Sequence, residues 1–119
     1  MGYIVNHTII VEGFEEKHML EARGIACSIF AKHDLHGLVS GIYPHAINGT
    51  MSFMIAPDGS KEGWDVSDQG DKARDEFIAW LIGARTRKDN RRYLDWVEIV
   101  CPEDEPPHIG RHTIKDDDQ

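Results

Sequence analysis

Stretches in which apolar and polar residues alternate predict four strands in this chain. They are rich in β-branched and aromatic residues and cover positions 4–11, 38–47, 50–56 and 93–101. Asn48 and Gly49 both tolerate positive φ and separate the second stretch from the third, so these two stretches are expected to form a hairpin. Pro44 has no N–H group to donate to a neighbouring strand, which places the second stretch at an edge of the sheet.

Apolar residues at helical spacing predict two helices between these strands. The first covers about 15–36, ends at Gly37 and contains Gly24, whose missing side chain predicts close packing of the backbone against a neighbour. The second begins after Ser67 and Asp68, which are good N-cap residues. The buried stripes are expected at Met19, Ala22, Ala26, Ile29 and Phe30, and at Ala73, Phe77, Trp80, Leu81 and Ala84.

The resulting order is β-α-β-β-α-β, which predicts an α+β fold of the ferredoxin-like class. Right-handed crossovers and the edge position of the Pro44 strand give a two-layer sandwich, an antiparallel sheet with two helices on one face. We expect residues 1–101 to form this single domain. Residues 102–119 are expected to be an acidic, proline-containing C-terminal tail, partly disordered and ordered only near Ile109 and Ile114, because prolines and like charges disfavour packing.

The second face of such a sheet would stay open. It carries either Val5, His7, Ile9 and Val11 or the residues that alternate with them. An open face of this kind would be available for pairing with a second copy of the chain, as a homodimer.

Length and composition allow one globular domain. The chain has 119 residues, 13 basic and 21 acidic, and a formal net charge of −8. No apolar run reaches the roughly 20 residues that a membrane span requires, so no membrane association is expected. Cys27 and Cys101 are too few for a disulfide framework, which indicates a reducing cytoplasm.

Motifs for catalysis or cofactor binding are missing from the sequence. It contains no Walker loop, no Gly-x-Ser-x-Gly elbow and no His-Glu-x-x-His zinc motif. Histidine pairs occur at His33 and His36 and at His108 and His112, but zinc needs three or four converging ligands, and nothing in the sequence brings the pairs together. We therefore expect no enzyme, no metal site and no cofactor.

A basic cluster stands out against this acidic background and is one candidate site. Clustered guanidinium groups could bind the phosphates of a nucleotide, and an adjacent tyrosine could stack on its base. The sequence favours the alternative, a solvated helix end paired with nearby acids, and the net charge of −8 makes nucleic acid an unfavourable partner. The cluster consists of Arg85, Arg87, Lys88, Arg91, Arg92 and Tyr93.

The loop at 57–68 is a second candidate site, for a partner protein. Trp64 lies between Gly63 and Asp65, where a large aromatic side chain is costly to leave in water. It is either an anchor for a partner or a lid over the core, and the sequence supports both interpretations equally. The partner-binding surface would consist of Trp64 with the charged residues Asp58, Lys61, Glu62, Asp65 and Asp68.

Several stretches resemble small, uncharacterised proteins encoded by tailed bacteriophages and prophages. The resemblance covers roughly residues 4–100 and is carried by 52–64, by Asn6-His7 and by 95–98, together with Ser67-Asp68, Arg74, 77–78 and 80–81. The basic segment and the acidic tail lie outside the family pattern. Since the family has no assigned reaction, the resemblance implies a setting, the infected bacterial cell, and no catalytic residue.

Together these observations predict a non-enzymatic phage accessory protein in the cytoplasm of the bacterial host. It would bind and modulate a host protein or complex, as an inhibitor of a defence or nucleic-acid-processing system does. The alternative is a protein that binds and sequesters a small ligand or nucleotide through the basic cluster.

Overall fold

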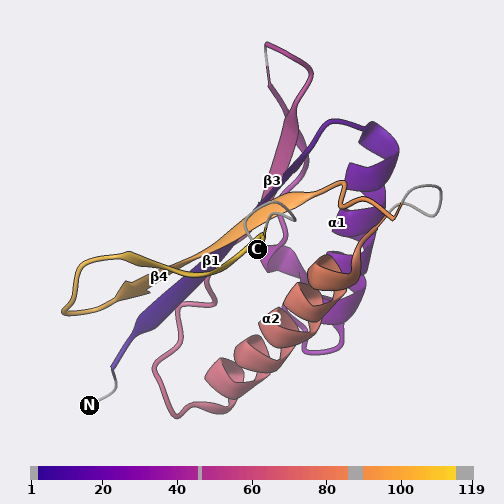
Figure 1. The fold of residues 1–119 in the computed structure, drawn as a ribbon. Coiled ribbons are helices and arrows are strands. Elements are labelled where there is room, and N and C mark those ends of the chain that lie inside the picture. The colour runs from indigo at the N-terminus through magenta and orange to yellow at the C-terminus, as the bar shows by residue number, and fades with distance from the viewer. Residues whose placement is uncertain (1–2, 46, 86–89, 115–119) are drawn as a thin grey trace.

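β1 (Val5–Gly13) is the central strand of an antiparallel sheet and pairs with a neighbour along each of its edges. In the computed structural model, which describes residues 3–45, 47–85 and 90–114, the sheet has five strands in the order β2-β3-β1-β4-β5 (Figure 1). The other strands are β2 (Tyr43–Pro44), β3 (Met51–Ile55), β4 (Asp95–Pro102) and β5 (His108–His112).

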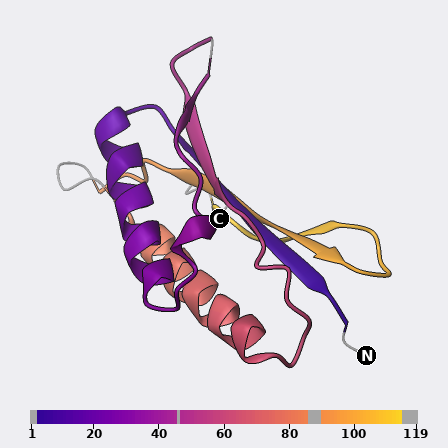
Figure 2. The same ribbon diagram turned by 180° about the vertical axis from the view of Figure 1, so that it is seen from behind.

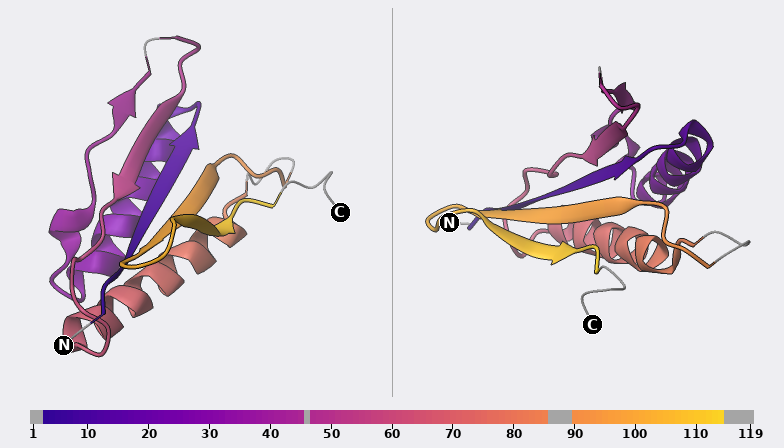
Figure 3. Two further views of the ribbon diagram at one scale, coloured as in Figure 1. Left: turned by 90° about the vertical axis from the view of Figure 1, so that its left-hand side faces the viewer. Right: turned by 45° about the horizontal axis from the view of Figure 1, so that its top comes forward.

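Two helices, α1 (Glu16–Ala31) and α2 (Asp65–Gly83), pack against each other and cover one face of this sheet (Figures 2 and 3). The apolar residues between the two layers are almost fully buried, among them Ile9 and Val11 of β1 and Phe53 of β3. The prediction of an antiparallel sheet beneath two helices is therefore confirmed. The predicted stripes are also buried, except for Trp80, which is half-buried and stacks on Phe77.

The second face of the sheet carries an apolar band. Ile10 lies opposite Met54 on one side and opposite Val97 on the other, and Ile99 lies opposite Ile109. Within the described residues, neither helix covers this face (Figure 3). Pairing of the band with a second copy of the chain stays a prediction.

The predicted hairpin forms, but its first strand is much shorter than the predicted 38–47. Asn48 and Gly49 have φ of +68° and +70°, as expected, and Pro44 lies in the edge strand. Regular pairing of β2 with β3 is confined to Tyr43 and Pro44. Before them, the hydroxyl oxygen of Ser40 accepts the N–H of Met54, so a side chain replaces the backbone acceptor that a continued strand would supply.

Both helices begin or end at different residues from those predicted. α1 ends at Ala31 because Asp34, with φ of +59°, adopts the left-handed conformation that was expected of Gly37. The N–H of Leu35 then bonds to the carbonyl of Phe30 at 2.9 Å, as in a Schellman motif. α2 begins at Asp65, directly after Trp64, so Ser67 lies buried within its first turn and is not the N-cap residue.

The segment predicted to be a partly disordered tail, ordered only near Ile109 and Ile114, contributes the strand β5 to the sheet, so the sheet extends beyond the predicted domain end at residue 101. β5 pairs antiparallel with β4, Val97 opposite His112 and Ile99 opposite Ile109. Prolines 102, 106 and 107 lie at the end of β4 and in the connection, where no N–H group is needed. The acidic end 115–119 lies outside the described residues.

Among the described residues, neither helix is long and apolar enough to cross a membrane.

The surroundings of two glycines predict opposite effects of alanine. A Cβ atom at Gly24, in the middle of α1, would meet nothing within 4 Å, so the predicted close packing there is wrong. Gly24→Ala should raise the free energy of unfolding by about 0.5–1 kcal/mol, because alanine loses less backbone entropy in a helix. At Gly13 a Cβ would lie 3.0 Å from Met19 Sδ and 3.1 Å from Leu94 Cδ2. Gly13→Ala should therefore lower the free energy of unfolding. Urea denaturation of the two variants measures both effects, and an equal change in the free energy of unfolding of both would contradict the packing described.

Candidate functional site

The loop that precedes α2 is held in place by a buried ion pair. The carboxylate of Asp58 lies 3.3 Å from Nη1 of Arg74, and both side chains are less than a tenth exposed. Asp58 also accepts the backbone N–H of Ser60 at 2.8 Å and the hydroxyl of the same serine. Burial opposes ionisation of Asp58, but these hydrogen bonds and the guanidinium outweigh it and hold its pKa below the usual range. The sequence predicted that Asp58 belongs to the partner-binding surface. In the structure its side chain is buried and supports the loop from inside.

Trp64 lies at the end of this loop, and its side chain is 53% exposed. Its backbone is ordered: its N–H donates to the carbonyl of Lys61, and its carbonyl accepts the N–H of Asp68 in the first turn of α2. The ammonium of Lys61 lies 5.9 Å from the centre of the indole ring. Trp64 is thus no lid over the core. It belongs to a group of residues, here called the Trp64 surface, that are exposed except for the half-buried Lys61: Lys61, Glu62, Trp64, Asp65, Val66 and Asp68.

Tyr3 brings a second acidic segment to the same end of the molecule. Its carbonyl accepts the N–H of Glu62 at 2.7 Å, and its hydroxyl donates to Asp104 at 2.6 Å. The hydrogen bond to Asp104 raises the pKa of Tyr3 to about 12. The exposed carboxylates of 103–105, between β4 and β5, therefore join those of the Trp64 surface, although about 40 positions separate the two segments in the sequence.

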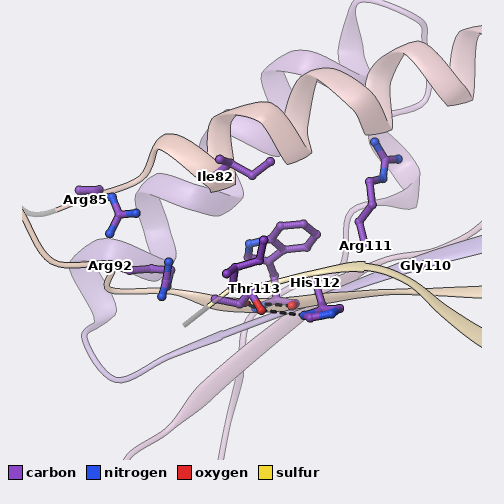
Figure 4. Close-up of a pocket in the computed structure, with 9 residues that line it drawn as sticks. Ile82, Arg85, Arg92, Gly110, Arg111, His112 and Thr113 are labelled. Atoms are coloured by element: carbon purple, nitrogen blue, oxygen red, sulfur yellow. Dashed lines mark hydrogen bonds between the residues drawn. The ribbon is translucent and has the colours of Figure 1, made fainter. Parts of the chain in front are cut away.

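At the other end of α2, the structure forms a pocket of about 430 Å³ (Figure 4). It lies between the last turn of α2, β4 and β5, and the segment that joins α2 to β4 supplies two arginines to its wall. We call it the Trp96 pocket. The lining includes Ile82, Arg85, Arg92, Trp96, Arg111 and Ile114.

The basic cluster predicted from the sequence is divided by the structure. Arg85 and Arg92 line the Trp96 pocket and lie opposite each other in an isolated antiparallel bridge. Arg91 is exposed and does not line it. Tyr93 faces α1, where its ring lies 4.0 Å from that of His18 and its hydroxyl donates to Glu21, so it cannot stack on a ligand in the pocket. Arg87 and Lys88 lie outside the described residues.

Sequence reasoning did not find Arg111, which lay in the supposed tail. Its Nε donates to Oε1 of Glu98 at 2.9 Å, its Nη2 to Oε2 at 3.1 Å, and its Nη1 to Asp75 of α2 at 3.0 Å. Nδ1 of His7 lies 3.1 Å from Glu98. The only hint in the sequence was the glutamate itself, which falls on the alternating apolar face of the 93–101 stretch.

Glu98 is ionised in the folded protein even though it is buried. Burial alone would raise its pKa, but the hydrogen bonds from His7 and Arg111 dominate and hold the pKa far below its ordinary value of 4.5. The same contact with Glu98 raises the pKa of Arg111. This charged group fastens β5 to both the sheet and α2.

Metal binding finds no support in the residues that the structure describes. No three of their histidine, cysteine, aspartate or glutamate side chains converge in a way that could hold an ion.

Comparisons with protein-family models, with curated proteins and with solved structures found no match to this chain. The resemblance to phage proteins therefore stays a prediction, and the roles of the Trp64 surface and of the Trp96 pocket are inferred from their own residues.

The Asp58–Arg74 pair predicts a large loss of stability when one partner is removed. Arg74→Met keeps most of the apolar packing but leaves the Asp58 carboxylate buried without its cation, and should lower the free energy of unfolding by about 3 kcal/mol. Lys72→Met, at an exposed position of the same helix, is the control and should change it by less than about 0.5 kcal/mol. Chemical denaturation measures both, and similar values for the two variants would show that the pair is not buried in solution.

The lowered pKa of Glu98 predicts that its contribution depends on pH. A carboxylate whose pKa is lower in the folded state stabilises the fold fully above its unfolded pKa of about 4.5, and this contribution is lost as the pH falls towards the folded pKa. Glu98→Gln should therefore destabilise the protein by about 2 kcal/mol at pH 7, and by progressively less below pH 4.5. Unfolding curves of both proteins from pH 7 to pH 3 test this, and a difference independent of pH would contradict it.

Proposed function

We propose that this protein works by binding a partner protein through the Trp64 surface, without catalysis. The observation that carries the proposal is the 53% exposure of Trp64 on an ordered backbone. Tryptophan is the residue type most enriched among interface hot spots. An exposed tryptophan whose backbone is already fixed loses little conformational entropy when it binds.

The support of the loop adds to this proposal. The buried Asp58–Arg74 pair and the glycine at position 63, with φ of +90°, hold the chain where the indole faces solvent. Val66, in the first turn of α2, is 41% exposed and extends the apolar area beside Trp64. A rigid aromatic and aliphatic centre with charged neighbours has the composition of a small protein interface.

The charges indicate the chemistry of the partner. Glu62, Asp65 and Asp68 are exposed around Trp64, and Tyr3 connects them with the carboxylates of 103–105. These carboxylates around an exposed indole favour a partner whose surface is basic and contains an apolar pocket for the indole. Their negative electrostatic field would speed association with such a partner at low salt.

The proposed setting is the cytoplasm of a phage-infected bacterium, with a host protein as the partner. Its support is the resemblance of residues 4–100 to proteins of tailed phages and prophages. We also propose that the fold is ferredoxin-like: the order β2-β3-β1-β4 within the sheet supports this, and β5 would be an addition at the β4 edge.

Trp64→Ala tests the function directly. We expect this variant to lose a bacterial partner that the wild type retains in affinity capture, with affinity for the purified partner reduced by about 30-fold or more. Charge reversal at Asp65 and Asp68 should slow association and remove most of its salt dependence, because these residues surround the contact.

Phe14→Ala is the matched control. Phe14 is also aromatic, is 68% exposed, and lies next to the opposite end of β1 from Tyr3. Partner capture that is unchanged by Trp64→Ala, or reduced equally by Phe14→Ala, would refute the assignment of the surface. Unfolding midpoints equal to that of the wild type would show that both variants are folded.

A further inference from the structure

We propose that the Trp96 pocket binds a small aromatic anion, a flat ring system that carries one phosphate or carboxylate group. This inference is independent of the proposed function, because the pocket and the Trp64 surface share no residue. They lie at opposite ends of α2, whose 19 residues span about 28 Å.

The size and the walls of the pocket suit a small molecule. A volume of about 430 Å³ lies within the usual range of ligand sites. Ile82 and Ile114 line the pocket and are 60% and 61% exposed, so both present apolar surface that a ring could cover. Trp96 supplies a further aromatic wall, and its position is fixed because Thr113 bonds to its backbone N–H and carbonyl.

The charge at one side of the pocket favours an anion. Arg85 and Arg92 face each other across an antiparallel bridge, where directly opposite like charges repel. Both side chains also interact within the protein, but a guanidinium has five N–H groups and can bind a further acceptor. An anion between them would accept charge-assisted hydrogen bonds from both.

Arg111 has a different part in the site. Its charge is balanced by Glu98 and Asp75, so it adds little net attraction for an anion. Those contacts hold its guanidinium in place beside the pocket, where it limits the space available to the ring. Arg85 and Arg92, which also line the pocket, are the guanidinium groups that we expect to donate to the ligand, and two such groups suit a ligand with one anionic group.

The rest of the chain argues against a polyanion as the occupant. The formal net charge is −8, so a nucleic acid strand that extends beyond the pocket would meet a repulsive field. A small ligand carries its charge only where the two arginines lie. A free mononucleotide and the terminal nucleotide of a nucleic acid share the required chemistry, and binding experiments separate these two sources.

Calorimetric titrations of the full chain with adenosine monophosphate, phenyl phosphate and benzoate test the proposal. At least one of the three should bind with a dissociation constant below a millimolar. Adenosine and inorganic phosphate, which each supply only one half of the ligand, should bind at least tenfold more weakly. A 5′-phosphorylated oligonucleotide should bind more weakly than the mononucleotide, and tighter binding of the oligonucleotide would overturn the preference for a free small ligand.

Variants locate the binding. Arg85→Gln and Arg92→Gln should each raise the dissociation constant of the anion by roughly tenfold or more. Arg91→Gln removes the same charge from the same segment but outside the pocket lining, and should change affinity less than twofold. Ile82→Glu places a negative charge at an exposed lining position and should abolish binding, whereas Trp64→Ala should leave it unchanged.

The proposal would be overturned by the absence of binding by all three anions, by an effect of Arg91→Gln as large as that of Arg92→Gln, or by binding that survives Ile82→Glu. Backbone amide NMR spectra of each free variant show whether it is folded, and ligand-induced shifts that miss the indole N–H of Trp96 would place the ligand elsewhere.

Discussion

The carboxylate of Glu98 lies on the helix-covered face of the sheet, where a negative charge without partners would destabilise the fold by several kcal/mol. Its partners come from two strands, His7 of β1 and Arg111 of β5. Gly110 permits the approach of β5, since a Cβ there would lie only 2.8 Å from Oε1 of Glu98. The buried charge therefore dictates that β5 docks on β4, and the Trp96 pocket, which takes part of its wall from β5, exists only in that arrangement.

A second buried charge has the same effect at the other end of α2. Asp58 and Arg74 are held out of water together, and Gly70 leaves room for the carboxylate beside the helix. The pair orders a loop rich in glycine and charged residues that would otherwise gain little by packing. With the loop held in this way, Trp64 faces solvent at a defined position.

The two surfaces differ in charge and are separated by the length of α2. Carboxylates surround the Trp64 surface, whereas Arg85 and Arg92 face the Trp96 pocket. A basic partner protein and a small anion would therefore select different ends of the molecule, and one would not exclude the other. The same separation makes the proposed anion site compatible with the net charge of −8.

Local patterns in the sequence determined most elements of the fold. The alternation in β1 and β4, the Asn48-Gly49 turn and the helical stripes each depend on neighbours within a few residues, so they can be read along the chain. The tertiary structure decided what depends on distant partners. It buries Asp58 against Arg74 and places Arg111 in a strand of the sheet. It also directs the side chain of Tyr93 towards α1, whereas that of Arg92 lines the Trp96 pocket. Proline and acid density predicted a partly disordered tail at 102–119, because that pattern reports only local preference. The buried Glu98 carboxylate, which pairs with Arg111, makes docking of β5 favourable.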